Sequence, residues 1–153
     1  MLRHSSSEPA RRMSDDLIHQ MIRWARPPNT SLAIPRGCDL RQLPSEVWDL
    51  VHLERLNVGF NQLESVSPNI ARLTELRYLN LAGNQLGSLP PEIGELANLE
   101  YLQLMGNQID SVPPEIGCLR KLRCLHLSDN QLEHVPPEIG SLIPIHVSVW
   151  SFP

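Results

Sequence analysis

The feature that most constrains this chain is a leucine-rich motif that recurs every 23 residues. Four copies follow the pattern L-x-x-L-x-L-x-x-N-x-L, with Val58 at the third leucine position of the first copy and Ile109 at the last position of the third. The repeated asparagines are Asn61, Asn84, Asn107 and Asn130. Self-similarity at this period is typical of a solenoid, because a single unit cannot bury its leucines without neighbours.

Each copy of the motif predicts a short strand followed by a turn. Side chains alternate along a strand, so Leu79 and Leu81 face one way while Tyr78 and Asn80 face the other. Stacking the units in register then forms a parallel sheet over one elongated leucine core. An asparagine amide both donates and accepts, so a buried asparagine column satisfies turn groups that would cost roughly 1–3 kcal/mol each if unpaired.

The second half of each unit reads [LV]-P-P-E-I-G-x-L in three copies. Paired prolines favour a turn followed by a short helical start. The two patterns together resemble leucine-rich repeats, and they are similar to the 23-residue repeats of intracellular Ras-group scaffolds and of the Scribble and Erbin group. The resemblance implies an α/β leucine-rich repeat solenoid, with a short curved parallel sheet on the concave face and turns and short helical segments on the convex face.

The spacing divides residues 30–153 into repeats. We predict a worn first repeat at 30–52, full repeats at 53–75, 76–98, 99–121 and 122–144, and an irregular end at 145–153. In the worn repeat, Cys38 takes the asparagine position, and the spacing aligns Leu32 with Arg55 and Ile34 with Asn57.

The register of the irregular end stays open. Ile145, Val147 and Val149 alternate as in a strand, yet a spacing of 23 puts Ser148 where a leucine is expected. A slip of one residue would reverse every side chain.

The N-terminal segment differs from the repeats. Residues 1–13 are polar and lack apolar periodicity, which predicts a disordered tail. For residues 14–29 we predict an amphipathic capping helix and a linker, with Ser14 as N-cap. A membrane-surface or partner-binding helix is the alternative. Ser7 and Ser14 fit short phosphorylation patterns, against the simpler interpretation of a solvated basic tail.

The outward strand positions form the candidate protein-binding face, because tyrosine and arginine often anchor interfaces and methionine adapts to apolar partners. The candidate residues are Arg55, Asn57, Phe60, Tyr78, Asn80, Tyr101, Gln103, Met105 and His126. In the alternative interpretation, the adjacent tyrosines only stabilise one another across the strands, by roughly 0.2–1 kcal/mol.

Composition restricts the class of binding partner and the cellular compartment that we expect. A net charge of −4 argues against nucleic acid, which usually needs a basic face. We find neither an apolar run of membrane-spanning length nor a signal-peptide pattern, which favours the cytoplasm, with the nucleus as the alternative. Three cysteines are too few and wrongly placed for the disulfide caps of extracellular repeats.

No catalytic signature, metal-ligand spacing or phosphate loop is present, so we predict no enzyme activity, no catalytic residue, no cofactor and no metal. The resemblance implies a monomeric adaptor whose protein partner is a small GTPase, a kinase or a phosphatase. The alternative is the targeting or regulatory part of a larger or truncated leucine-rich repeat enzyme of kinase, GTPase or cyclase type.

Overall fold

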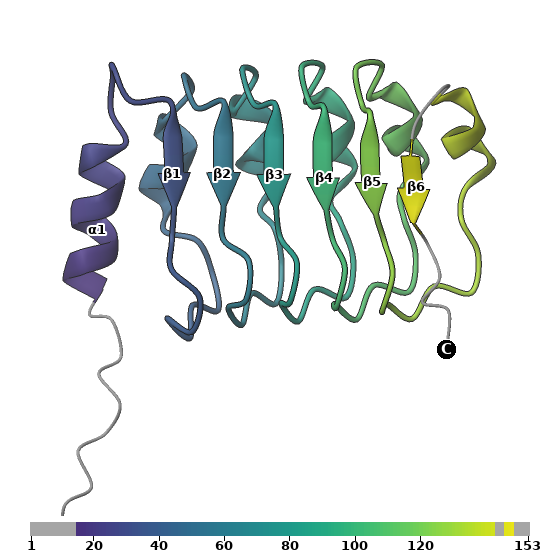
Figure 1. Ribbon diagram of the computed structural model, residues 1–153, viewed down its shortest axis with the longest axis horizontal. Helices are drawn as coiled ribbons and strands as arrows, with labels where there is room; N and C mark the ends of the chain where they lie inside the picture. Colours follow the sequence, from purple (N-terminus) through teal and green to yellow (C-terminus); the bar gives the residue numbers. More distant parts are fainter. Residues whose placement is uncertain (1–14, 143–145, 149–153) are drawn as a thin grey trace, which may run out of the picture.

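The computed structural model describes residues 15–142 and 146–148 of the chain (Figure 1). Its regular elements are one α-helix, a row of short strands and a row of short 3-10 helices. The helix is α1 (Asp15–Trp24). The strands are β1 (Ser31–Ala33), β2 (Arg55–Asn57), β3 (Tyr78–Asn80), β4 (Tyr101–Gln103), β5 (Cys124–His126) and β6 (His146–Ser148). The 3-10 helices are η1 (Ser45–Asp49), η2 (Pro68–Arg72), η3 (Pro91–Glu95), η4 (Pro114–Cys118) and η5 (Pro137–Ser141).

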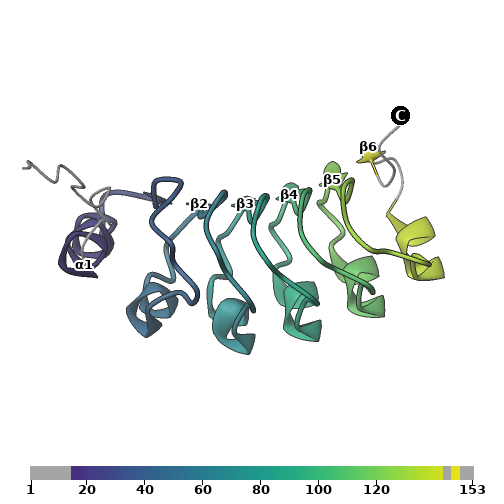
Figure 2. The same ribbon diagram turned by 90° about the horizontal axis from the view of Figure 1, so that it is seen from below.

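The strands form one parallel sheet in chain order, β1-β2-β3-β4-β5-β6. Leu56, Leu79, Leu102 and Leu125 are register partners from β2 to β5. Figure 2 shows the strands along one side of a curved stack and the 3-10 helices along the other. The predicted solenoid architecture is therefore confirmed.

One elongated core lies between these two layers. Leu79 and Leu81 of the strand side and Ile93 and Leu96 of the helical side are fully buried. Repeating the same positions in each unit joins all of them into a single apolar cluster along the stack. The stability of each unit thus depends on its neighbours, as expected for a solenoid.

Three of the 3-10 helices, η3, η4 and η5, begin at the second proline of a pair, where the sequence predicts a helical start. In η3, Pro90 is extended, with φ −71° and ψ 144°, and Pro91 is the first helical residue. The helix is one short turn, closed by a hydrogen bond from the Leu96 N–H to the Ile93 carbonyl. Proline at the first helical position suits this geometry, since its missing N–H would have no helical partner there.

The first repeat departs from the predicted register. Leu32 pairs with Leu56, so the spacing here is 24, and Leu32 and Ile34 are 2% and 3% exposed rather than outward-facing. The prediction that aligned Leu32 with Arg55 was wrong, because burying two aliphatic side chains outweighs strict periodicity. The extra residue is absorbed before Cys38, where Gly37 has φ +74°.

The last described strand shows the opposite departure. Val147 pairs with Leu125 and packs against the core, so the spacing has shortened to 22. This one-residue slip puts an aliphatic side chain where a spacing of 23 would have put Ser148. The register that the sequence left open is thereby decided by core packing.

Helix α1 lies beside β1 at the end of the sheet (Figure 1). Ile18, Ile22 and Ala25 are buried in the common core, whereas Leu17 and Trp24 from the same predicted apolar stripe are 37% and 70% exposed. The helix therefore covers the first repeat with only one side of that stripe.

Two further contacts join α1, or the residue directly after it, to the first repeat. His52 Nε2 lies 2.7 Å from the Ala25 carbonyl oxygen, and His19 Nε2 lies 3.6 Å from a Glu46 carboxylate oxygen. Ser7, Ser14 and the predicted tail lie outside the described residues. Among the described residues, no helix combines the length and apolar character needed to cross a lipid bilayer.

Candidate protein-binding face

The repeated asparagines form a hydrogen-bonded ladder where the chain leaves the strands. Asn84 is 7% exposed, and its Oδ1 accepts a hydrogen bond of 2.9 Å from the Leu63 N–H of the preceding repeat. Its Nδ2 donates to the carbonyl oxygens of Leu81 in its own repeat and Val58 in the preceding one. Equivalent bonds recur at Asn107 and Asn130, so each asparagine ties two repeats together.

Cys38 extends this ladder with different chemistry. Its thiol donates to the Pro35 carbonyl oxygen three residues earlier, at 2.9 Å, as each asparagine amide donates to the carbonyl oxygen three residues before it. Its own N–H donates to Asn61 Oδ1. Burial, together with the nearby Asp39 carboxylate, raises the pKa of the Cys38 thiol, which favours the protonated donor.

The concave sheet surface brings three of the predicted residues into one row. The Arg55 guanidinium carbon lies 4.5 Å from the centre of the Tyr78 ring, which is a cation–π contact. The Tyr78 and Tyr101 rings follow at 6.4 Å between centres, tilted by 43°. The Tyr78 hydroxyl also donates to the Gln103 amide oxygen at 3.4 Å. This row of side chains, with Phe60 and Met105, is called the aromatic patch below.

Several apolar side chains of the aromatic patch are exposed to solvent. Phe60, in the repeat of β2, is 58% exposed, and Tyr101 and Met105, in the repeat of β4, are 39% and 37% exposed. Tyr78 is half-buried beneath its neighbours. The patch therefore presents a rigid central ring flanked by accessible apolar groups, an arrangement suited to protein recognition.

Other predicted contact residues support the backbone instead. Asn80 is 9% exposed, and its Oδ1 accepts from the Ala82 N–H at 2.9 Å. Asn57 makes the same bond to the Gly59 N–H at 3.1 Å. A Cβ atom on Gly59 would lie 3.0 Å from Asn80 Oδ1, so glycine makes room for that side chain. Asn80 is thus a structural residue of the face and offers little surface to a partner.

Phe60 has a backbone conformation that phenylalanine rarely adopts. Its φ is +57°, in the left-handed region, and the equivalent positions in the next two repeats are Gly83 and Gly106. Its ring lies directly over Gly83, where an added Cβ would meet a ring carbon at 2.5 Å. A non-glycine residue held in this region typically costs about 1–2 kcal/mol, and such strain clusters at functional sites. Sequence reasoning missed Gly83 as the support for this ring.

His126 lies at the far end of the face, on β5. Cys124 Sγ and His126 Nε2 are 3.0 Å apart, within hydrogen-bond distance, and both side chains are half-buried. Partial burial raises the pKa of the Cys124 thiol, which disfavours the thiolate. Among the described residues, no group of three or more histidine, cysteine or acidic side chains is arranged to hold a metal ion.

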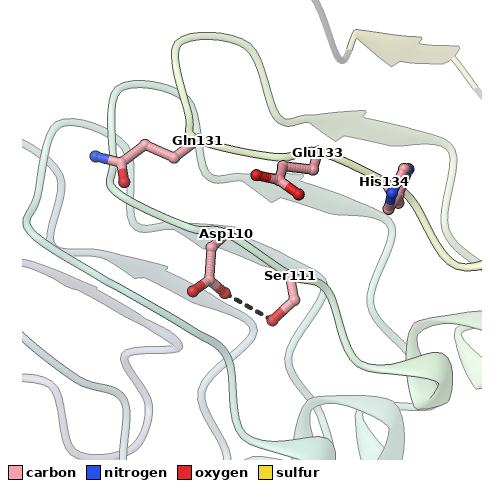
Figure 3. A pocket seen from close by; sticks show the side chains of 5 residues that line it. All are labelled: Asp110, Ser111, Gln131, Glu133 and His134. Atoms are coloured by element: carbon pink, nitrogen blue, oxygen red, sulfur yellow. Dashed lines mark hydrogen bonds between the residues drawn. The ribbon is translucent and has the colours of Figure 1, made fainter.

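A polar depression lies on the flank of the stack, where the chain has left the strands (Figure 3). It is lined by Asp110, Ser111, Gln131, Glu133 and His134. The Ser111 hydroxyl donates to the Asp110 carboxylate at 2.8 Å. All five side chains are exposed, so water screens their charges strongly. We therefore place the candidate site on the concave face.

Comparisons with solved structures agree with this architecture. A leucine-rich repeat protein of Leptospira interrogans superimposes with a TM-score of 0.71 and 27% identity, over 88% of this chain and 40% of that chain. The plant peptide hormone receptor RGFR1, solved in complex with RGF2, gives 0.65 and 34% identity over 70% of this chain and 18% of that chain.

A third similar structure is the leucine-rich repeat ectodomain of the membrane receptor kinase GASSHO1/SCHENGEN3 from Arabidopsis thaliana, in complex with CASPARIAN STRIP INTEGRITY FACTOR 2. It gives a TM-score of 0.61 and 35% identity over 69% of this chain and 13% of that chain. The present chain thus spans less than half the length of each of these proteins.

No curated protein matches the chain. The family model described as "Leucine-rich repeat region" matches residues 67–147, which is more than half of the chain. With the asparagine ladder, the parallel sheet and the similar structures, this match shows that the chain belongs to the leucine-rich repeat family.

Proposed function

We propose that this protein is a binding module that holds a protein partner on its concave face, with the aromatic patch as the centre of the contact. The observation that carries the proposal is the stacked row of Arg55, Tyr78 and Tyr101 beside the exposed side chains of Phe60 and Met105. Arginine and aromatic residues are enriched among the side chains that dominate interface energies. The two plant neighbours were each solved with a bound partner, which supports a binding role for this fold.

The rigidity of the row also supports binding. Tyr78 is held between the Arg55 guanidinium and the Tyr101 ring, and its hydroxyl is bonded to Gln103. Side chains fixed before association lose less conformational entropy when a partner binds. The patch therefore combines exposed apolar area with a low ordering cost.

The central test is affinity purification of the wild type beside a Tyr78→Ala, Tyr101→Ala double variant. We expect the partner signal to fall by roughly tenfold or more, because loss of central interface aromatics typically costs 2 kcal/mol or more. Quantitative mass spectrometry measures the signal, and circular dichroism checks the fold. A Glu95→Ala, Arg120→Ala variant on the exposed convex side is the control. Full retention of every partner by the double variant would refute the proposal.

Phe60→Gly separates binding from stability. Glycine relieves the left-handed strain, so we expect the free energy of unfolding to rise or to change by less than about 1 kcal/mol. Partner binding should nevertheless weaken, because the exposed ring is lost. Urea denaturation and a binding titration with the purified partner measure the two effects. A loss of stability of roughly 2 kcal/mol or more would instead make Phe60 a structural residue.

The proposed setting is intracellular signalling, with a small GTPase, a kinase or a phosphatase as the partner class. The structure contains no disulfide bond among Cys38, Cys118 and Cys124, and Cys118 is exposed, which suits a reducing compartment. The same binding face would serve an adaptor or the targeting part of a larger enzyme. Imaging of a fluorescent fusion, with protease protection of intact cells, tests the compartment. An extracellular location would exclude this setting and leave the binding role intact.

A further inference from the structure

Arg55 differs from the arginines beside it in its electrostatic surroundings. Arg77 and Arg123 both pair with Glu100, at 3.0 Å and 3.7 Å. Across residues 15–142, no carboxylate lies within ion-pair distance of the Arg55 guanidinium, which instead lies over the Tyr78 ring. The concave face therefore contains a cation whose charge is not neutralised by a neighbouring acid.

Stacking on Tyr78 also orients this cation. A guanidinium over an aromatic ring keeps its N–H groups at the edge of the plane, where they remain available to a ligand. The planar array of donors matches a carboxylate, which it can bind through two parallel hydrogen bonds. The ring thus acts as a support that holds Arg55 ready for an anion.

The outward strand positions reinforce the preference for an acidic ligand. From β1 to β5, one of these positions is formally charged at neutral pH, and none is acidic. The positions are Ser31, Ala33, Arg55, Asn57, Tyr78, Asn80, Tyr101, Gln103, Cys124 and His126. A lone positive charge on this surface attracts an acidic segment and disfavours a basic one.

The remainder of the aromatic patch sets the spacing of the ligand. Tyr101 and Met105 belong to the repeat of β4, two strands away from Arg55 on β2. Neighbouring strands are about 4.8 Å apart, so the separation is roughly 10 Å. A peptide in the extended polyproline II conformation advances about 3.1 Å per residue with three residues per turn, so side chains three residues apart face the same side and lie roughly 9 Å apart.

We propose that the concave face binds a peptide segment in the extended polyproline II conformation, in which an acidic side chain pairs with Arg55 and an apolar side chain, three residues away, packs on Tyr101 and Met105. This inference rests on the proposed function and adds the chemistry of the ligand. Among the outward strand positions from β1 to β5, Arg55 is the one charged side chain, and a single guanidinium suits a carboxylate better than a doubly charged phosphate. The acidic residue is therefore glutamate or aspartate.

The test uses a displayed library of random linear peptides selected against the full chain. Wild type should enrich peptides with an acidic residue and an apolar residue at the proposed spacing. Arg55→Gln should lose the acidic preference and bind the enriched wild-type peptides roughly tenfold more weakly, which corresponds to about 1.4 kcal/mol. Arg120→Gln, in an exposed loop of the convex side, should behave as wild type. Added salt should weaken wild-type binding but hardly affect Arg55→Gln.

Different failures identify different errors. Peptides that lack an acidic preference but require Tyr78 and Tyr101 would overturn this inference and keep the proposed function. Enriched peptides that bind equally to every concave variant would overturn both. A tenfold preference for phosphoserine over glutamate in synthetic versions of the same peptide would overturn the carboxylate assignment. The absence of any enriched peptide would overturn the inference, while the affinity purification would still test the proposed function.

Discussion

Gly94→Ala is expected to lower the free energy of unfolding by roughly 2 kcal/mol, although alanine normally favours a helical turn. A Cβ atom at this position would lie 2.5 Å from the backbone oxygen of Glu115 and 2.8 Å from its Cβ. Backbone atoms of η4 cannot move aside without shifting the whole turn. The closest packing between neighbouring repeats on the convex side therefore requires glycine, and urea denaturation measures the cost.

The chain contains a matched control for this prediction. Gly140 occupies the same position in the last P-P-E-I-G segment, and a Cβ atom there would meet no atom of the described residues within 4 Å. Gly140→Ala should leave stability unchanged or raise it by up to about 1 kcal/mol, because alanine restricts the unfolded chain. At Gly117 the added Cβ would lie 2.8 Å from Glu138 Cβ and 2.9 Å from the Glu138 backbone oxygen. These longer distances predict a smaller loss of stability than at Gly94. Equal effects at Gly94 and Gly140 would show that propensity, and not close packing, determines the outcome.

Asn84→Ala is expected to lower the free energy of unfolding by roughly 2–3 kcal/mol. The carbonyl oxygens of Leu81 and Val58 each keep a second donor, from Asn107 and Asn61 respectively. The buried N–H of Leu63 has its hydrogen bond to Asn84 Oδ1, and the substitution removes that acceptor. The unsatisfied donor therefore accounts for most of the loss.

Thermal and urea denaturation of Asn84→Ala measure this loss. The control is Gln85→Ala, which changes the exposed neighbouring side chain and leaves its backbone hydrogen bond to Leu63 in place. Its stability should lie within about 0.5 kcal/mol of wild type. If Asn84→Ala were as stable as this control, the ladder would be a consequence of the fold rather than a source of its stability.

The parts of the structure that were predictable from sequence are those in which one local pattern recurs. The leucines and asparagines repeat with a constant spacing, and each unit meets the same neighbours, so a strand position in one repeat predicts the next. Cys38 could be placed in the asparagine column by this spacing, and its thiol makes the corresponding hydrogen bond. Phe60 could have been singled out as strained, because glycine stands at the same point in the two repeats that follow.

The ends of the stack were not predictable in this way. At β1 and β6 the spacing becomes 24 and 22, because Leu32 and Val147 gain more from burial than from strict periodicity. The apolar stripe of α1 was visible in the sequence, but packing against one repeat buries Ile18 and Ile22 and leaves Trp24 exposed. At an end, a repeat has a neighbour on one side only, so packing rather than period sets the register.

Side-chain alternation combined with a constant period made the solenoid, the inward positions from β2 to β5 and the asparagine column predictable from the sequence alone. Tertiary packing, in contrast, determines which outward residues are exposed to a partner. It placed Arg55 over Tyr78, brought the Phe60 ring onto Gly83 and used Asn80 to hold a turn. The reason is that exposure and charge pairing depend on neighbours 23 residues away, whose side-chain directions no single repeat specifies.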